Sequence, residues 1–424
     1  MQYLISTPLL RTRVRVASVT AIAGLTYLAY YTILSVRADN AFRENSPVSL
    51  RLACRLIPES AVYHALLAEH MEAAGVDPDQ ELRIATELSP RQARYWIRRS
   101  FRAEVEQKFA ESERYLIEAK RVDKGFDPPW ALANFYFRRG RTTDFWAEMR
   151  DALKMSYGDP DPIFRLGLAM NDDSSLLKDV LPPRRDVQLA FVAYLMQNND
   201  INSAAQVAES LAAGARIEEE TVFLNYCETQ TRNNTASALK VWNSLCQRNL
   251  VPFQALSPLS GRVVTNGEFA AGHISWGFDW RYSGTDAVSY GQVDASLLRG
   301  LAININGQQP DSTVLLEQIL PLAPGSRYTI GYEYQLAGAT GDSGLRWTVF
   351  GTGSNATEGS EPLATSSVLS GTEWTNGGVT FPSGNHELAI LRLEYRRMPG
   401  TVRWIGTLRI RRVVSALAGN GPAH

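Results

Sequence analysis

The feature that most constrains this chain is an apolar stretch close to its N-terminus. Residues 16–36 are 21 consecutive positions without a charged side chain. As an α-helix rising about 1.5 Å per residue, this stretch is roughly 31 Å long, enough to cross the hydrocarbon core of a bilayer. Three arginines precede it, Arg11, Arg13 and Arg15, and the first acidic residue is Asp39. Because positive charge stays on the cytoplasmic side, the sequence predicts a transmembrane helix over 16–36 and a cytoplasmic segment over 1–15.

Two alternatives to an anchor remain open. Val36-Arg37-Ala38 loosely fits the small-residue pattern of a signal-peptide cleavage site. A buried helix of a soluble protein is the second alternative. The stretch is longer than the apolar core of a usual signal peptide, which favours an anchor. We therefore expect a single-pass protein of a bacterial inner membrane, with the bulk of the chain on the periplasmic side.

A repeat of about 33 residues runs through the region 40–250. Alanines recur 32, 34 and 33 residues apart, each before a similar break, at Ala53, Ala85, Ala119 and Ala152. Ala205 and Ala238 are again 33 apart. A small residue at the end of the second helix of a pair lets neighbouring helices approach closely. This spacing predicts an all-α solenoid of helix pairs over residues 40–250, interrupted between Asn171 and Pro183.

The period and the residues of one segment resemble the tetratricopeptide repeat. Residues 130–137, Trp-Ala-Leu-Ala-Asn-Phe-Tyr-Phe, are followed by Gly140, which resembles the first helix of such a repeat and its turn. The segment 130–137 does not contain the Leu-Gly pair of that family. The resemblance implies that the helical region binds a protein partner, which we expect to belong to the cell envelope.

Composition changes near Pro252. Residues 251–262 contain two prolines and a glycine and are typical of a linker. Beyond them the spacing of apolar residues changes from about 3.6 residues, typical of a helix, to 2 residues, typical of a strand. This alternation is seen from Tyr328 to Leu336 and from Ile274 to Tyr282. Further strands are expected over 297–305, 313–320, 345–350, 379–381, 387–395 and 402–413. About eight strands without a helical stretch predict an all-β sandwich over 263–415, followed by a tail over 416–424.

The order of short motifs in this region resembles jelly-roll carbohydrate-binding modules. Asn-Gly-Glu-Phe at 266–269 opens the region, Pro324-Gly325 precedes a strand with Tyr328, and Trp374 precedes the last third. Such modules often carry an Asp in the final strand that helps to hold calcium. The corresponding stretch here, 404–407, has no carboxylate, so the resemblance does not extend to calcium. It implies glycan binding.

Aromatic rings stack on sugar faces, and neighbouring polar side chains bind hydroxyl groups. The ligand-binding candidates are therefore Trp276, Trp280, Trp347, Trp374, Asp279 and Arg281. The alternative for three of the tryptophans is the core of the sandwich: Trp276, Trp280 and Trp347. Trp374 is the better exposed candidate, since it lies beside a turn.

Several classes of site find no support in the sequence. A net charge of −1 gives no electrostatic reason to expect nucleic acid. The three cysteines and five histidines show no metal-ligand spacing, so we expect no metal and no cofactor. Cys227 and Cys246 are expected on adjacent helices, where they either form a disulfide or are buried as thiols.

No motif of a known catalytic class is present. We therefore expect a non-catalytic scaffold that binds glycan and a protein partner, in a process such as assembly or export of surface polysaccharide. A purely structural subunit of an envelope complex and a divergent glycan hydrolase are the alternatives.

Overall fold

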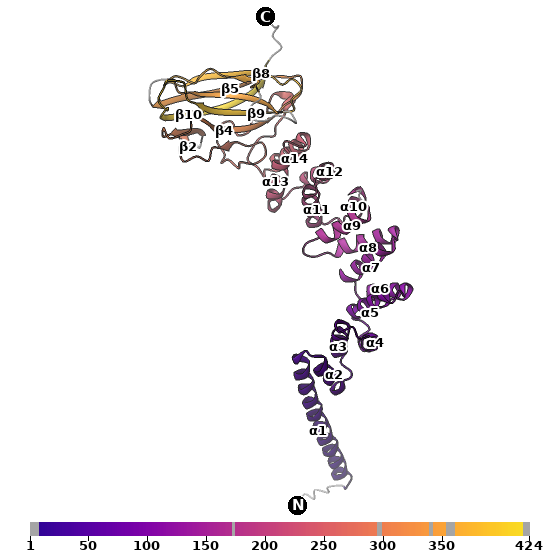
Figure 1. The fold of residues 1–424 in the computed structure, drawn as a ribbon. Coiled ribbons are helices and arrows are strands. Elements are labelled where there is room, and N and C mark those ends of the chain that lie inside the picture. The colour runs from indigo at the N-terminus through magenta and orange to yellow at the C-terminus, as the bar shows by residue number, and fades with distance from the viewer. Residues whose placement is uncertain (1–7, 172–173, 295–298, 339–341, 353–360, 419–424) are drawn as a thin grey trace, which may run out of the picture. The chain divides into compact units, whose positions relative to one another are not determined.

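The computed structural model describes residues 8–171, 174–294, 299–338, 342–352 and 361–418 (Figure 1). The chain forms two compact units, Met1–Arg184 and Arg185–His424. The first unit is helical, and the second combines helices with two β-sheets. The predicted fold class, a helix-pair solenoid followed by a β sandwich, is confirmed.

The helices of the first unit follow one another with short connections. They are α1 (Pro8–Glu44), α2 (Pro47–Leu56), α3 (Ala61–Ala73), α4 (Asp79–Leu88), α5 (Ala93–Val105), α6 (Phe109–Val122), α7 (Asp127–Arg139), α8 (Thr142–Met155), α9 (Asp161–Met170) and α10 (Ser174–Val180). Each odd-numbered helix packs against the even-numbered helix that follows it. Gly140 ends α7 with a φ of 65°, a conformation that favours glycine, as the repeat-like segment predicts.

Helix α1 is long and apolar enough to span a membrane. The segment Arg15–Glu44 has a mean hydropathy of 1.5 in its most apolar window, and no residue of that window is buried. Figure 1 shows α1 extending beyond α2 and α3. Its last turns are different, because Ala38 and Ala41 are buried in a cluster with Leu50 and Ala53 of α2. A single helix therefore has an exposed apolar part and a packed C-terminal part.

The repeated alanines have a packing reason in the first unit. Ala53, Ala85, Ala119 and Ala152 lie near the ends of α2, α4, α6 and α8, and each is 0% exposed. In the second unit the alanines with the same spacing lie elsewhere: Ala205 and Ala238 come near the starts of their helices. The same alanine spacing therefore falls near the ends of the helices in the first unit and near their starts in the second.

The second unit begins with two further helix pairs. Its helices are α11 (Arg185–Gln197), α12 (Ile201–Ala212), α13 (Glu220–Gln230) and α14 (Thr235–Gln247). Helix α11 packs on α12, and α13 packs on α14. Two short 3-10 turns, Ile217–Glu219 and Pro258–Ser260, come before α13 and after α14.

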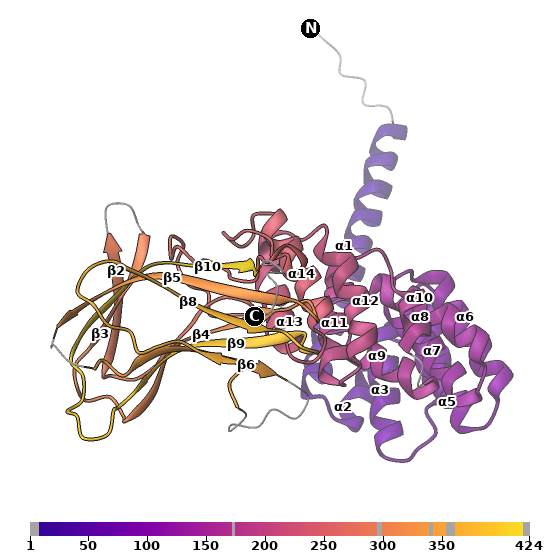
Figure 2. The same cartoon turned by 90° about the horizontal axis from the view of Figure 1, so that it is seen from above.

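In the part of the chain that the structure describes, ten strands then form two antiparallel five-stranded sheets that face each other (Figure 2). One sheet has the order β1-β4-β9-β6-β7, and its strands are Arg281–Tyr282, Ser312–Pro321, Leu388–Arg396, Leu345–Thr352 and Ala364–Thr365. The other has the order β2-β3-β10-β5-β8, and its strands are Val288–Asp294, Arg299–Ile305, Gly406–Leu417, Arg327–Gly338 and Thr375–Pro382. This arrangement is a β sandwich.

The predicted alternation is clearest in β5. Its even-numbered residues from Tyr328 to Leu336 are buried between the sheets, and the odd-numbered residues from Thr329 to Gln335 are at most partly buried. Because side chains of a strand point alternately to opposite faces, the polar set lies on the outer face of this sheet. That outer face carries the groove described below.

The strand expected from Ile274 to Tyr282 is wrong for most of its length, since only Arg281 and Tyr282 are extended. The preceding residues form a tight loop, in which Ser275 and Gly277 have φ values of 59° and 57°. The physical reason is the buried carboxylate of Asp279, which accepts hydrogen bonds from the N–H groups of Ile274 (2.6 Å) and Ser275 (3.4 Å). These bonds turn the backbone, so the alternation of residue types does not reflect a pleated strand.

Candidate functional site

A groove of 610 Å³ lies on the sheet that contains β5 and β10. Its lining is mostly polar or charged, with one aromatic ring, one valine and one glycine. It comprises Glu268, Val293, Arg299, Gly300, Glu333, Gln335, Trp374, Arg409, Arg411 and Arg412. A second hollow of 540 Å³ shares Glu268 with it.

Strand pairing brings the groove residues together from distant parts of the sequence. Strand β10 is paired with β5, and Gln335 and Arg409 are directly opposite each other. The register shifts between Ile410 and Arg412, which is a β-bulge. As a result Arg411 and Arg412 are both exposed and both reach Glu333, instead of one of them entering the core.

Ion pairs and a ring contact hold the groove side chains in place. The Arg411 Nη1 atom donates to Glu333 Oε1 at 2.6 Å, and Arg412 Nε lies 3.4 Å from Glu333 Oε2. The Arg411 guanidinium also lies over the Trp374 ring, 4.0 Å from its centroid. At this distance the cation is attracted to the ring face. Trp374 therefore supports an arginine as well as lining the groove.

Two tryptophans predicted as ligand-binding candidates belong to the core. Trp280 and Trp347 are both 0% exposed, and their ring centroids lie 6.1 Å apart. The Trp280 ring also contacts Phe269, with 5.4 Å between centroids, and its Nε1 donates to the carbonyl of Asn266 at 3.3 Å. Neither ring is accessible to a ligand, in agreement with the core alternative for these two residues.

Asp279 and Arg281 lie outside the groove, beside the last helix pair. Arg281 Nη2 donates to the Glu228 carboxylate of α13 at 2.7 Å, and the same oxygen accepts the Gly277 N–H at 2.7 Å. The Trp242 ring of α14 packs against Gly277 and lies 5.8 Å from the Phe278 ring, centroid to centroid. Burial raises the pKa of Asp279. These residues join the sandwich to α13 and α14.

Trp276 is 36% exposed in the same loop and does not line the groove. The candidates from the sequence therefore fall in three places: Trp374 in the groove, two tryptophans in the core, and the other residues at the loop. The arginines of β10 were not among the candidates from the sequence. Their signal was the run Arg409-Ile410-Arg411-Arg412, in which the charges depart from strict alternation.

Cys227 and Cys246 are both buried, and the structure has both as free thiols. The Cys227 thiol lies 3.6 Å from the carbonyl oxygen of Ala238 on α14. Burial raises the pKa of both thiols, that of Cys246 to about 12. A thiol with such a pKa stays protonated at neutral pH and is a poor nucleophile.

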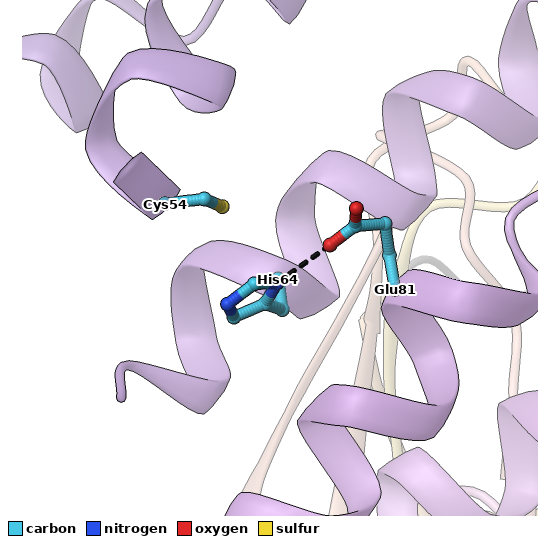
Figure 3. A group of neighbouring side chains, drawn as sticks. All are labelled: Cys54, His64 and Glu81. Carbon is cyan, nitrogen blue, oxygen red and sulfur yellow. Dashed lines mark hydrogen bonds and ion pairs between the residues drawn. The ribbon is translucent and has the colours of Figure 1, made fainter. Parts of the chain in front are cut away.

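A cluster of potential metal ligands in the first unit was not predicted, since no metal site of histidine and cysteine was expected from the sequence. Figure 3 shows Cys54, His64 and Glu81, which come from α2, α3 and α4. Their potential ligand atoms lie within 4.8 Å of one another. His64 Nδ1 is 2.5 Å from Glu81, and its Nε2 is 3.0 Å from the carbonyl of Pro58.

Both ring nitrogens of His64 thus already have acceptors, and burial raises the pKa of the Cys54 thiol to about 11. A metal would have to displace the Glu81 and Pro58 contacts and deprotonate the thiol. In the described geometry the cluster connects three helices of the first unit and does not form an open metal site.

No protein-family model matches the sequence, and a search of curated proteins finds no match. Among solved structures, the enzymatically active domain of tailspike protein 4 from bacteriophage CBA120 is similar over 38% of this chain, with 14% identity and a TM-score of 0.28. The match covers only 22% of the tailspike chain.

The xylan-binding domain CBM22-1 of Xyn10C from Paenibacillus barcinonensis is similar over 37% of this chain and 94% of its own, with 12% identity and a TM-score of 0.27. PilF from Pseudomonas aeruginosa is similar over 53% of this chain and 91% of its own, with 19% identity and a TM-score of 0.20. Because all three TM-scores are below 0.5, the fold class rests on the helices and sheets of this chain itself.

Proposed function

We propose that this protein is a non-catalytic, membrane-anchored binding protein of the bacterial cell envelope. The sandwich binds glycan in the groove around Trp374, and the helix pairs bind a protein partner. The observation that carries the glycan proposal is the groove itself. It combines an aromatic ring, arginine and amide donors, and carboxylate acceptors on the outer face of one sheet. Such a set matches the ring faces and hydroxyl groups of a saccharide.

Substitution of Trp374 by alanine is expected to weaken glycan binding by about tenfold, because both the ring and its support for Arg411 are lost. Full-length protein in detergent micelles, applied to a glycan array and then titrated against the best ligand, measures this effect. Trp276→Ala is the matched control, since it removes an exposed tryptophan outside the groove. Loss of binding in the Trp276 variant alone would place the glycan site at the loop instead.

The anchor is proposed to be retained rather than cleaved. The residue at the candidate cleavage point, Ala38, is 0% exposed and packs with α2. Asp39 accepts a hydrogen bond from the Tyr63 hydroxyl at 2.5 Å, and the Phe42 and Tyr63 ring centroids are 5.2 Å apart. A cut after Ala38 would divide α1 within this packed region. We propose that the N-terminus is cytoplasmic and that the chain beyond residue 36 is periplasmic.

Protein purified from membranes is therefore expected to contain residues 1–38 and to resist extraction at alkaline pH. Intact-mass spectrometry measures the first property, and carbonate extraction the second. An internal control is the Ala38→Leu variant, which removes the small residue required for cleavage and should leave the mass changed only by the substitution. A mature N-terminus at Asp39 would contradict the proposal.

The junction at Glu228 favours a second candidate function, in which the sandwich is a structural cap of the helix pairs. Arg281 and Gly277 both bond to Glu228, so α13 and the sandwich are held together within the second unit. A protein partner that co-purifies unchanged with a Trp374→Ala and Arg409→Gln double variant, while no glycan binds to the wild type, would support this candidate over the first.

A further inference from the structure

The charge of the groove is unusual for a site that receives a neutral sugar. Its charged lining residues are four arginines and two glutamates, Arg299, Arg409, Arg411, Arg412, Glu268 and Glu333. Four positive charges minus two negative charges leave a net charge of +2. The whole chain has a net charge of −1, so the positive charge is a local property of this face.

Both glutamates of the groove already have arginine partners. Glu333 accepts from Arg411 at 2.6 Å and lies 3.4 Å from Arg412, while Glu268 lies 3.7 Å from Arg299. Within the described part of the chain, Arg409 has no acidic partner. Its Nη1 donates to the neutral amide oxygen of Gln335 at 3.2 Å. The excess positive charge therefore resides mainly on the side chains of β10.

Arg411 is held in position before any ligand binds. Its guanidinium is fixed by Glu333 on one side and by the ring face of Trp374 on the other. A guanidinium has five N–H donors in a planar fork that matches the two oxygens of a carboxylate. Only one of these donors has an acceptor in the described contacts. Because the side chain is already ordered, binding an anion costs less conformational entropy.

Stacking of a sugar ring on an aromatic side chain does not by itself account for the composition of this groove. The Arg411 guanidinium occupies one face of the only aromatic ring among the lining residues. Two residues before Arg409 on β10, Thr407 Oγ1 donates a hydrogen bond to Asn304 Oδ1 at 2.7 Å. The groove therefore offers charge and hydrogen bonds more than apolar surface.

We infer that the glycan bound in this groove is an acidic polysaccharide, recognised through the carboxylates of its uronic acid residues. This inference rests on the proposed glycan-binding function and names the chemical class of the ligand. Arg409 and Arg411 receive the carboxylate, and Gln335, which also lines the groove, binds hydroxyl groups.

The test compares two forms of one polymer, polygalacturonate and its fully methyl-esterified form, which differ in charge but share a backbone. Binding of full-length protein in micelles is measured by biolayer interferometry at low and high salt. The acidic form is expected to bind at least about tenfold more tightly at low salt, because a charge-assisted hydrogen bond is stronger than a neutral one. High salt should reduce this difference.

Arg409→Gln and Arg411→Gln are each expected to weaken binding of polygalacturonate by about tenfold. Arg396→Gln is the matched control, since it makes the same change on an exposed arginine of β9 in the other sheet. Among the described contacts, the only hydrogen bond of the Arg409 side chain is the one to Gln335. The Arg409 variant therefore keeps the test valid even if the Arg411 variant unfolds.

Equal binding of the two polymers, or binding of a neutral glucan or xylan alone, would overturn this inference and leave the proposed function standing. Equal loss of polygalacturonate binding in the Arg396 variant would overturn it as well, because the interaction would then follow overall charge. If neither these polymers nor a glycan array bound the protein, the proposed function itself would fail.

Discussion

Trp280→Ala is expected to lower the free energy of unfolding of the second unit by about 3–5 kcal/mol. The Trp280 ring is 0% exposed and lies between Phe269 and Trp347, so truncation leaves a large cavity that the rigid sheets cannot fill. The lost Nε1 bond also leaves the carbonyl of Asn266 without that donor. Chemical denaturation of the full chain, followed by circular dichroism, measures the change.

The matched variant is Trp374→Ala, which removes the same side chain from the groove. Because Trp374 is only half-buried, this variant is expected to change the free energy of unfolding by less than about 1 kcal/mol while it weakens glycan binding. Trp280→Ala should thus mainly lower stability, whereas Trp374→Ala should mainly weaken glycan binding. Equal losses of stability in the two variants would mean that Trp280 does not carry the core of the sandwich.

Gly267→Ala is expected to destabilise the second unit by at least about 3 kcal/mol. A Cβ atom at Gly267 would clash with the carbonyl oxygen of Val413 on β10. The Gly267 carbonyl also accepts the Val413 N–H at 2.7 Å. The added methyl group cannot fit unless β10 moves, and that movement breaks this bond. A fall in the denaturation midpoint measures the effect.

The control is Gly272→Ala, five residues along the same segment. A Cβ atom there would have no neighbour within 4 Å. Its effect is expected to stay within about 0.5 kcal/mol, as for other substitutions at open surface positions. If Gly267→Ala were as mild, the close approach of residues 266–269 to β10 would not be a requirement of the fold. This contact gives a physical reason for glycine in the Asn-Gly-Glu-Phe motif.

Several elements were determined by local sequence alone. The uncharged stretch 16–36 specifies a long apolar helix whatever the rest of the chain does. The alternation from Tyr328 to Leu336 specifies a strand with one buried face, and the structure shows β5 there. In the first case the signal is the length of an uncharged run, and in the second it is a period of two residues, which a β-strand shares. The outer face of β5 was thereby predictable, but its neighbours were not.

Tertiary structure decided which residues form the groove and which form the core. The alternation from Ile274 to Tyr282 has the same local period as β5, yet the Asp279 carboxylate bends most of it into a loop against α13. Cys54, His64 and Glu81 meet only because three helices pack together. The groove needs β10 beside β5 and a bulge that turns Arg411 and Arg412 toward Glu333. Such contacts depend on packing between segments that are distant in the sequence, and the local spacing of apolar residues cannot specify that packing.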